Sequence, residues 1–229
     1  MGVGVGDDVA DFSCIWLLAW LDAVTNARSP SRSSHFFPPH PHPNTDAYCS
    51  HANYNNEPNL GLWGVFDGHG GAGDHVSHFS KDELPLELVA QMGKLGKKKF
   101  SELSDVEMSQ ISHEAFVETN KSCHRAPFDS ELSGTTAISL MIKEDQMYIN
   151  NVGDSRAVVA VKKSSADHGT GAALKAEHLS IDQTPFRKDE RERVKLCGAK
   201  VMTIDQIEGL EPIHENWGLN LGEEVDESG

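Results

Sequence analysis

Cysteine is scarce in this sequence, and its spacing follows no recognisable ligand pattern. The four cysteines, at positions 14, 49, 123 and 197, are scattered along 229 residues, and no two stand in a CxxC pair. This spacing argues against a structural zinc site and against a disulfide framework. Free thiols are typical of reducing compartments, so we expect an intracellular protein, cytoplasmic or nuclear.

Long hydrophobic runs are also missing. Residues 15–24 (IWLLAWLDAV) are apolar but short and interrupted by Asp22, whereas a membrane-spanning helix needs about 20 apolar residues. The residues before them carry three aspartates in place of the basic start of a signal peptide. We therefore expect residues 15–24 to form a short amphipathic or buried helix and the protein not to be a membrane protein. A membrane-associated anchor is the alternative.

Positive charge is in short supply. The chain has 20 Lys and Arg against 35 Asp and Glu, which gives a formal net charge of −15. An acidic chain is repelled by phosphate backbones, so nucleic acid is excluded as the expected partner. The excess of carboxylates suits hard cations such as Mg²⁺ or Mn²⁺, although most acidic residues simply solvate a surface. Nothing in the sequence indicates the oligomeric state.

The composition divides the chain into two parts. Residues 29–43 (SPSRSSHFFPPHPHP) are rich in Ser, Pro and His and cannot bury enough apolar surface to fold, so residues 1–43 are predicted to be a disordered or atypical leader. Residues 44–229 read as globular, with enough length for one sizeable domain.

The globular part begins with strand and helix patterns. Residues 46–51 and 61–66 (GLWGVF) are predicted strands. Residues 71–92 show helical spacing that Pro85 is expected to kink or break. Residues 104–123 form a second predicted helix, in which Ser104 and Glu107 make a capping-box signature.

Strand patterns dominate the part that follows. Residues 135–142, 146–152 and 157–162 are predicted strands, and the first two are close enough for a hairpin. Residues 187–196 form a charged helix that Gly198 ends, and residues 199–204 are a further predicted strand. This order favours the α+β class, in which helices cover antiparallel sheets, over a parallel array.

The sharpest motif is Phe66-Asp67-Gly68-His69-Gly70-Gly71. It places a carboxylate and an imidazole among glycines at the end of a buried strand. Gly68 has no Cβ, so its carbonyl can approach an ion closely, and an imidazole such as that of His69 is a side chain suited to proton transfer. A glycine-rich turn with a polar tip is the alternative reading of this motif alone.

Further motifs follow in order. They are Ser133-Gly134-Thr135-Thr136-Ala137, the segment NVGDSRAV at residues 151–158, and Asp182-Gln183-Thr184-Pro185. In order and spacing, residues 44–201 resemble the protein phosphatase 2C family, the PPM-type metal-dependent serine/threonine phosphatases. The resemblance implies two antiparallel β-sheets in a sandwich flanked by helices. It also implies a hydrolase that removes phosphate from phosphoserine and phosphothreonine in proteins, so its partners would be phosphoprotein substrates.

The resemblance also implies residue roles. Two Mg²⁺ or Mn²⁺ ions would activate a water for attack on phosphorus. Asp67 matches the carboxylate that bridges both ions, and Gly68 matches a ligand through its carbonyl. Asp154 matches a position linked to a weaker third ion.

Other residues of the motifs match roles outside the metal ligands. His69 matches the residue that protonates the leaving oxygen, and Asp46 matches an acidic residue lying behind the ligands or bound through water. Ser133, Thr135 and Thr136 are expected to serve packing and turns.

The sequence departs from the family pattern at both ends. Pro41 stands where many members have a phosphate-binding arginine, and Thr45 replaces the usual Glu or Gln. Nothing after Val201 matches the downstream aspartates of the family. We therefore expect residues 44–229 to be the N-terminal part of a phosphatase domain, either as a fragment or as a natural truncation. The complete site is expected to need residues beyond Gly229, and the alternative function is a catalytically inactive, phosphatase-like binding module.

Overall fold

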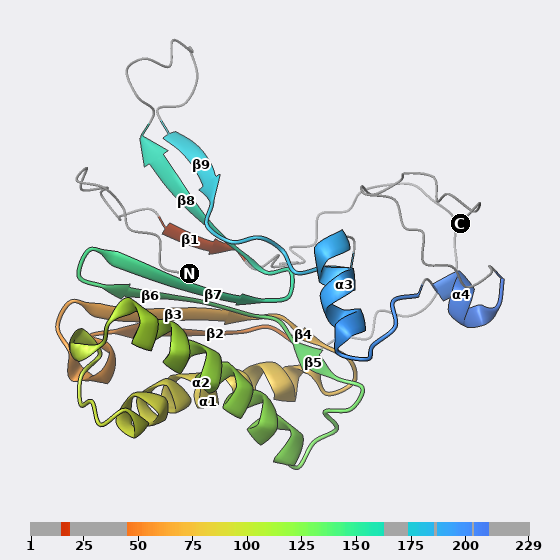
Figure 1. The fold of residues 1–229 in the computed structure, drawn as a ribbon, viewed down its shortest axis with the longest axis horizontal. Helices are drawn as coiled ribbons and strands as arrows, with labels where there is room; N and C mark the ends of the chain where they lie inside the picture. Colours follow the sequence, from red (N-terminus) through yellow and green to blue (C-terminus); the bar gives the residue numbers. More distant parts are fainter. Residues whose placement is uncertain (1–14, 19–44, 163–173, 186, 203, 211–229) are drawn as a thin grey trace, which may run out of the picture. The chain divides into compact units, whose positions relative to one another are not determined.

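The computed structural model describes residues 15–18, 45–162, 174–185, 187–202 and 204–210 (Figure 1). The chain divides into two units, residues 1–182 and residues 183–229. The predicted leader and the acidic tail lie almost wholly outside the described residues, so most of the leader, and the boundary at residue 44, stay predictions.

The first unit is built on a four-stranded antiparallel sheet with the order β2-β3-β6-β7. Its strands are β2 (Ala47–Ala52), β3 (Leu60–Phe66), β6 (Ala137–Lys143) and β7 (Gln146–Val152). Strands β6 and β7 form the predicted hairpin, in which Lys143 pairs with Gln146 and Glu144 adopts a φ of 56° in the turn. The strands expected from the sequence are confirmed here, within a residue or two at their ends.

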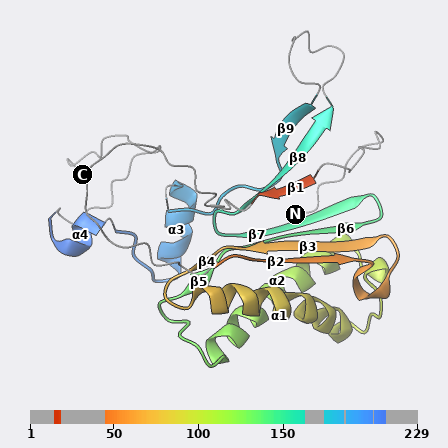
Figure 2. The same ribbon diagram turned by 180° about the vertical axis from the view of Figure 1, so that it is seen from behind.

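Helices α1 (Gly73–Lys94) and α2 (Asp105–Arg125) cover one face of this sheet. Figure 2 shows α1 lying along β2 and β3. Alternate residues of β3 enter the core between sheet and helices, where Leu62 and Phe66 pack with Met108 and Ile111 of α2. The capping box is confirmed, because the Ser104 hydroxyl accepts from the Glu107 amide and the Glu107 carboxylate accepts from the Ser104 amide.

Pro85 does not break α1, contrary to one of the two expected outcomes. The helix runs from Gly73 to Lys94 with Pro85 inside it. A proline removes one helical amide and crowds the preceding turn. Here Pro85 is buried against the core, and its carbonyl accepts a hydrogen bond from the Tyr54 hydroxyl. Tertiary packing therefore outweighs the local preference.

A second antiparallel sheet has the order β1-β8-β9, with β1 (Ile15–Leu18), β8 (Arg156–Lys162) and β9 (Leu174–His178). The helix predicted over residues 15–24 is wrong for Ile15–Leu18, which pairs with β8 as a strand. A short apolar run fits either state, and here the pairing with β8 decides. Strand β9 was not foreseen; it has only five residues, and all of them are exposed.

The two sheets belong to one layered arrangement. Ile138 and Leu140 of β6 are buried on the face of the four-stranded sheet that is turned away from the helices. Strand β6 contacts β8, and strand β3 contacts β1. The predicted α+β class, with antiparallel sheets and flanking helices, is confirmed.

A third, very short pairing matters for the site. Strands β4 (Gly68–His69) and β5 (Gly134–Thr135) run antiparallel, with Gly68 opposite Thr135 and His69 opposite Gly134. This pairing brings together two motifs that lie more than sixty residues apart in the sequence. The first unit also contains two short helices, η2 (Tyr54–Asn56) and η3 (Phe100–Glu102).

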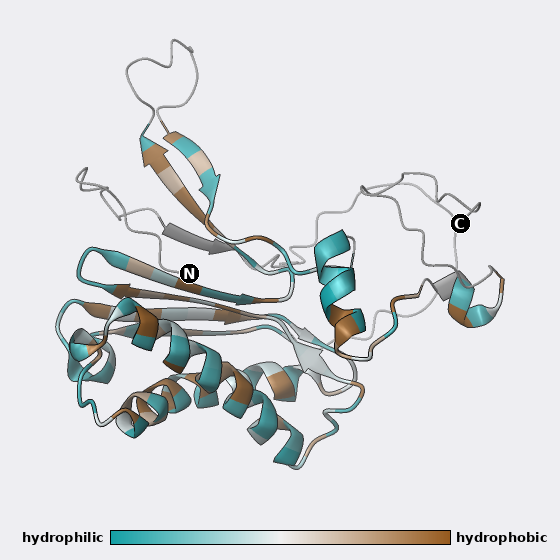
Figure 3. Cartoon of the chain, in the orientation of Figure 1, coloured by the Kyte–Doolittle hydropathy of each residue, from teal (hydrophilic) through white to brown (hydrophobic). Residues whose placement is uncertain are grey.

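The second unit contains α3 (Lys188–Leu196) and α4 (Ile204–Glu208). Helix α3 is hydrophilic along most of its length (Figure 3) and is followed by Gly198 at a φ of 84°, as predicted. The strand expected over residues 199–204 is wrong, because residues 199–202 form no regular structure and Ile204 begins α4. None of the helices described is long and apolar enough to cross a membrane.

Candidate active site

Asp67 stands immediately after β3, and the strand pairing sets its surroundings. Ala47 pairs with Phe66, so the next position in the antiparallel register places Asp46 beside Asp67. The Asp46 carboxyl group is one of the neighbours that raise the pKa of the Asp67 carboxyl group.

The backbone of Asp67 is fixed by the strand that follows α2. The Thr136 amide donates to the Asp67 carbonyl with an N–O distance of 2.8 Å, and the Thr135 hydroxyl donates to the same oxygen at 3.1 Å. The Asp67 amide donates to Thr136 Oγ1 at 3.1 Å. The carboxylate therefore projects from a backbone whose donor and acceptor are both engaged.

Burial and neighbouring acids raise the pKa of the Asp67 carboxyl group above its ordinary value. Burial is the largest cause, and the carboxylates of Asp46 and Asp154 add to it. The nearby His69 opposes the shift. Asp154 reaches this neighbourhood from the turn between β7 and β8, where Gly153 has a φ of 93°. Three acidic side chains thus interact at the ends of the strands.

His69 lies on the open side of this group. Its Nε2 is 3.7 Å from Asp67 Oδ1, which is beyond a hydrogen bond, and its side chain is 61% exposed. An imidazole in this place is free to meet a molecule arriving from solvent. The role predicted for it as a proton donor stays a prediction.

Position 68 requires glycine because two backbone segments pack closely against it, which the sequence did not show. A Cβ at this position would lie 2.2 Å from the Gly73 carbonyl oxygen and 2.5 Å from that of Thr45. The start of α1, the residue before Asp46 and the DGHG turn therefore pack backbone against backbone. The Ser77 hydroxyl also donates to the Thr45 carbonyl at 2.5 Å. Carbonyl ligation of an ion by Gly68 stays a prediction.

The fit of these residues to a cation is partial. Mutual repulsion among Asp46, Asp67 and Asp154 is a condition that a bound cation relieves, and oxygen donors suit Mg²⁺ and Mn²⁺. Within the part of the chain that the structure describes, however, no three His, Cys, Asp or Glu side chains come together closely enough to hold a metal ion. The described residues therefore form an incomplete ligand set.

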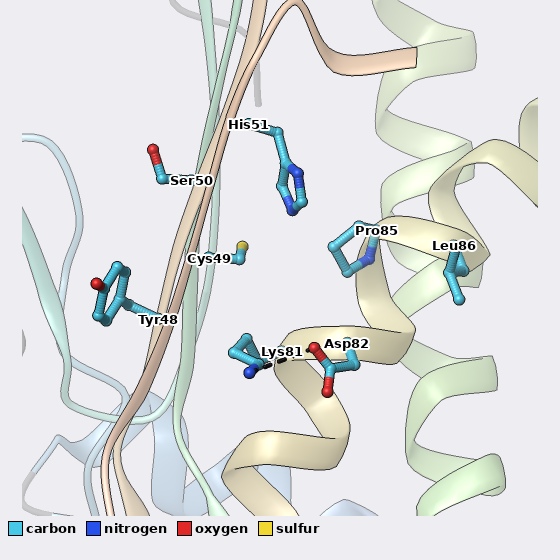
Figure 4. Close-up of a pocket in the computed structure, with 8 residues that line it drawn as sticks. All are labelled: Tyr48, Cys49, Ser50, His51, Lys81, Asp82, Pro85 and Leu86. Carbon is cyan, nitrogen blue, oxygen red and sulfur yellow. Dashed lines mark ion pairs between the residues drawn. The ribbon is translucent and has the colours of Figure 1, made fainter.

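A separate pocket lies between β2 and α1 and includes none of these residues. Its volume is about 280 Å³, and Figure 4 shows its lining, namely Tyr48, Cys49, Ser50, His51, Lys81, Asp82, Pro85 and Leu86. Burial raises the pKa of the Cys49 thiol to about 11. The thiol therefore stays protonated and is a poor nucleophile at neutral pH.

The structure brings together Asp46, Asp67, His69 and Asp154, which the sequence analysis singled out, and it packs Gly68 against the backbone of Thr45 and Gly73. Pro41 lies outside the described residues. The buried hydroxyls of Thr136 and Ser155, which face each other across this neighbourhood, were not foreseen as a pair. Alternation of buried and exposed positions could not reveal them, because each belongs to a turn or to a strand end.

Comparison with known proteins gives consistent matches. The family model described as "Protein phosphatase 2C" matches residues 21–212. Probable protein phosphatase 2C 35 of Arabidopsis thaliana is 43% identical over 175 residues, which cover 76% of this chain and 45% of that protein. Probable protein phosphatase 2C 48 of Oryza sativa subsp. japonica is 34% identical over 167 residues, which cover 68% and 46%.

Among solved structures, the serine-threonine phosphatase 2C from Toxoplasma gondii overlays with a TM-score of 0.48 and 18% identity, covering 67% of this chain and 54% of that one. The chain spans about half the length of the curated relatives it matches.

Proposed function

Because the chain belongs to the protein phosphatase 2C family, we propose that it contributes to the hydrolysis of phosphoserine and phosphothreonine in proteins. The observation that carries this proposal is the acidic group at the strand ends. Asp67 is partly buried beside Asp46 and Asp154. Its burial and the charges of these two neighbours all raise the pKa of its carboxyl group. Groups held in such an unfavourable electrostatic state are typical of functional sites.

We propose a division of roles among these residues. Asp67 and the Gly68 carbonyl would contribute oxygen ligands for two Mg²⁺ or Mn²⁺ ions, and Asp154 would contribute a ligand for a third, weaker ion. When bound, such ions lower the pKa of water and offset charge on the phosphoryl oxygens. Asp46, which the strand register places beside Asp67, lies behind these ligands or binds an ion through water. Exposed His69 donates a proton to the departing serine or threonine oxygen.

Under this proposal, the remaining metal ligands are residues outside the part of the chain that the structure describes. The partners are phosphoprotein substrates, and the location is the cytoplasm or the nucleus. A net charge of −15 disfavours acidic surfaces as partners, so a phosphorylated segment flanked by basic residues is the better substrate.

A second candidate is a phosphatase-like binding module without catalysis. The observation that favours it is the incomplete ligand set, since no three candidate metal-ligating side chains gather among the described residues. Such a module would capture a phosphopeptide without releasing phosphate, and a chelator would leave the capture unchanged.

The test uses the native protein, immunoprecipitated from its own cells with an antibody against residues 61–80. Phosphate release from a phosphothreonine peptide is measured with Mn²⁺, with Mg²⁺ and with EDTA, and the intact mass is read from the same sample. The proposal expects release that EDTA abolishes. Peptide capture without release would support the binding module, and release that resists EDTA would contradict the metal roles given to Asp67 and Asp154. A mass well above 25.0 kDa would locate the missing ligands in additional chain.

A further inference from the structure

The segment that follows β9 lies against the turn between β7 and β8. The Leu179 amide donates to the Ala157 carbonyl at 2.9 Å, and the Ala157 amide donates to Ser180 Oγ at 3.0 Å. These two bonds continue the pairing of β8 with β9 beyond His178, the last residue of β9. Residues 179–182, which we call the β9 extension, therefore stay attached to β8 after the strand itself has ended.

The β9 extension also reaches the residues on the other side of the turn. Asn151 of β7 donates from Nδ2 to the Ile181 carbonyl at 3.1 Å and to the Gly153 carbonyl at 3.3 Å. Its side chain therefore ties the extension to the turn itself. Asp154, the exposed acidic residue of the candidate site, stands directly after Gly153.

An ion pair closes the far end of the β9 extension. Arg156 Nε lies 2.8 Å from Asp182 Oδ1, and Arg156 Nη2 donates to Asp182 Oδ2. Two parallel hydrogen bonds of this kind hold the carboxylate in line with the guanidinium group, and they are stronger than bonds between uncharged groups. The two side chains are 43% and 25% exposed, so salt screens this pair less than it screens a fully exposed one.

These contacts involve a sequence motif that has no part in the proposed function. Asp182 begins the motif Asp182-Gln183-Thr184-Pro185 and is the last residue of the first unit. Through the β9 extension, it is linked to the residues before Asp154 and to those after it. The turn that carries Asp154 is therefore fastened on both sides.

The expected effect of the ion pair is local. A surface ion pair by itself contributes little to global stability. Without this pair, however, the β9 extension would rely on single hydrogen bonds between uncharged groups, and the turn would open more often. Opening of the turn would change where Asp154 lies relative to Asp67, whose carboxyl group it influences electrostatically.

We propose that Arg156 and Asp182 form a latch that holds the β9 extension across the β7–β8 turn, and that Asp182 is in this way a positioning residue for Asp154. The consequence for the reaction rests on the proposed function, in which Asp154 belongs to the acidic group of the site. The latch itself does not rest on it, since the contacts that form the latch include no ion and no substrate.

The test compares Asp182→Asn with Asp189→Asn in the native protein in EDTA. Asp189 is the matched control, because it also accepts two bonds from one guanidinium group, that of Arg187, but lies in the second unit. Hydrogen exchange is followed by mass spectrometry at single-amide resolution. We expect Asp182→Asn to speed exchange of the Ala157 and Leu179 amides about tenfold or more, and to leave the β6–β7 hairpin unchanged. Asp189→Asn should leave all of these amides at the wild-type rate.

Two conservative variants keep the latch falsifiable. Asp182→Glu keeps the carboxylate and should recover most of the protection. Arg156→Lys keeps the charge but loses the second hydrogen bond, so it should speed exchange at the same two amides, and it decides if Asp182→Asn does not fold. Unchanged exchange at Ala157 and Leu179 would overturn the latch. Faster exchange spread evenly over the chain would overturn it too, because it would indicate general destabilisation.

Phosphate release separates the latch from the proposed function. With a phosphothreonine peptide and Mn²⁺, we expect Asp182→Asn to lower kcat about tenfold with KM nearly unchanged, and Asp189→Asn to keep both. If exchange accelerates but kcat does not fall, the positioning role of Asp182 in the reaction is overturned. If the wild type releases no phosphate, the proposed function fails and that role falls with it, whereas the exchange rates still decide whether the latch exists.

Discussion

The two sheets of the first unit differ in what covers them. The four-stranded sheet has α1 and α2 on one face and buried Ile138 and Leu140 on the other. In the three-stranded sheet, Ala157 of β8 is fully buried, but β9 is exposed at every position. The acidic residues of the candidate site come from both, since Asp67 directly follows β3 of the first sheet and Asp154 precedes β8 of the second.

This difference indicates which half of the unit supplies most of the stability. The helix-covered half supplies a rigid base, so the backbone around Asp67 is fixed by packing as well as by hydrogen bonds. The half that carries Asp154 is joined to that base at a few points, among them the Thr136–Ser155 pair. Substitutions in the two halves should therefore have unequal effects.

The largest difference is expected between two Leu→Ala substitutions. Leu62 of β3 is 1% exposed, whereas Leu174 of β9 is 46% exposed. Leu62→Ala should lower the free energy of unfolding by about 2 to 5 kcal/mol, because it leaves a cavity in the core. Leu174→Ala should lower it by less than about 1 kcal/mol. Urea denaturation followed by circular dichroism measures both, and equal losses would show that the second sheet is packed as tightly as the first.

The next largest loss of stability is expected when a polar contact in the helix-covered half is removed. Glu57 is 5% exposed, and its carboxylate accepts from the Phe100 amide at 2.7 Å and from the Ser101 amide at 3.1 Å. Glu57→Gln should lower the free energy of unfolding by about 1 to 3 kcal/mol. Glu177→Gln, in exposed β9, is the matched control and should change it by no more than about 0.5 kcal/mol.

The pH dependence of Glu57 has a definite sign. Burial alone would raise its pKa, but the hydrogen bonds from Phe100 and Ser101 outweigh burial and lower it. A carboxyl whose folded-state pKa is lowered adds stability above its unfolded value of about 4.3, and that stability disappears as pH falls through the folded value. The wild type should therefore lose its advantage over Glu57→Gln on acidification below about pH 4.3, and an advantage that persists there would contradict the assigned hydrogen bonds.

A smaller effect of opposite sign is expected at Asp67. Its pKa is raised, so ionisation of Asp67 opposes folding. A raised folded-state pKa adds stability below the unfolded value of about 3.9 and loses it as pH rises through the folded value. Without metal at pH 7, Asp67→Asn should therefore raise the free energy of unfolding by about 0.5 to 2 kcal/mol.

The control for Asp67 is Asp82→Asn on α1, because Asp82 is exposed and only loosely paired with Lys81 at 3.4 Å. It should change stability by no more than about 0.5 kcal/mol in either direction. Thermal unfolding in EDTA compares the three proteins. A loss of stability in Asp67→Asn would mean that the carboxylate is stabilised in the metal-free fold.

The sequence predicted the helix-covered half well. The capping box at Ser104 and Glu107 and the hairpin closed by Glu144 are local signals, and the structure follows them. In the second sheet it predicted β8 but neither β9, which is short and exposed at every position, nor β1, because Ile15–Leu18 is too short to distinguish strand from helix. Both segments become strands because they pair with β8, and local sequence periodicity does not reveal which strands will pair.

The candidate site divides in the same way. The motif around Asp67 and His69 and the turn around Asp154 were recognisable as sequence patterns, and the structure brings them together. The hydroxyl pair of Thr136 and Ser155 was not predictable, since it depends on two turns meeting in space. The packing requirement at Gly68 has the same origin, because its close neighbours Thr45 and Gly73 come from different elements.

The most direct measurement is Mn²⁺-dependent phosphate release from a phosphothreonine peptide by the native protein and by the same protein carrying Asp67→Asn or Asp82→Asn. The proposed function predicts that Asp67→Asn lowers the rate at least about a hundredfold, as loss of a group that acts in the chemical step commonly does, while Asp82→Asn keeps it. Equal rates for Asp67→Asn and the wild type would contradict the proposal that the acidic group around Asp67 is the catalytic centre.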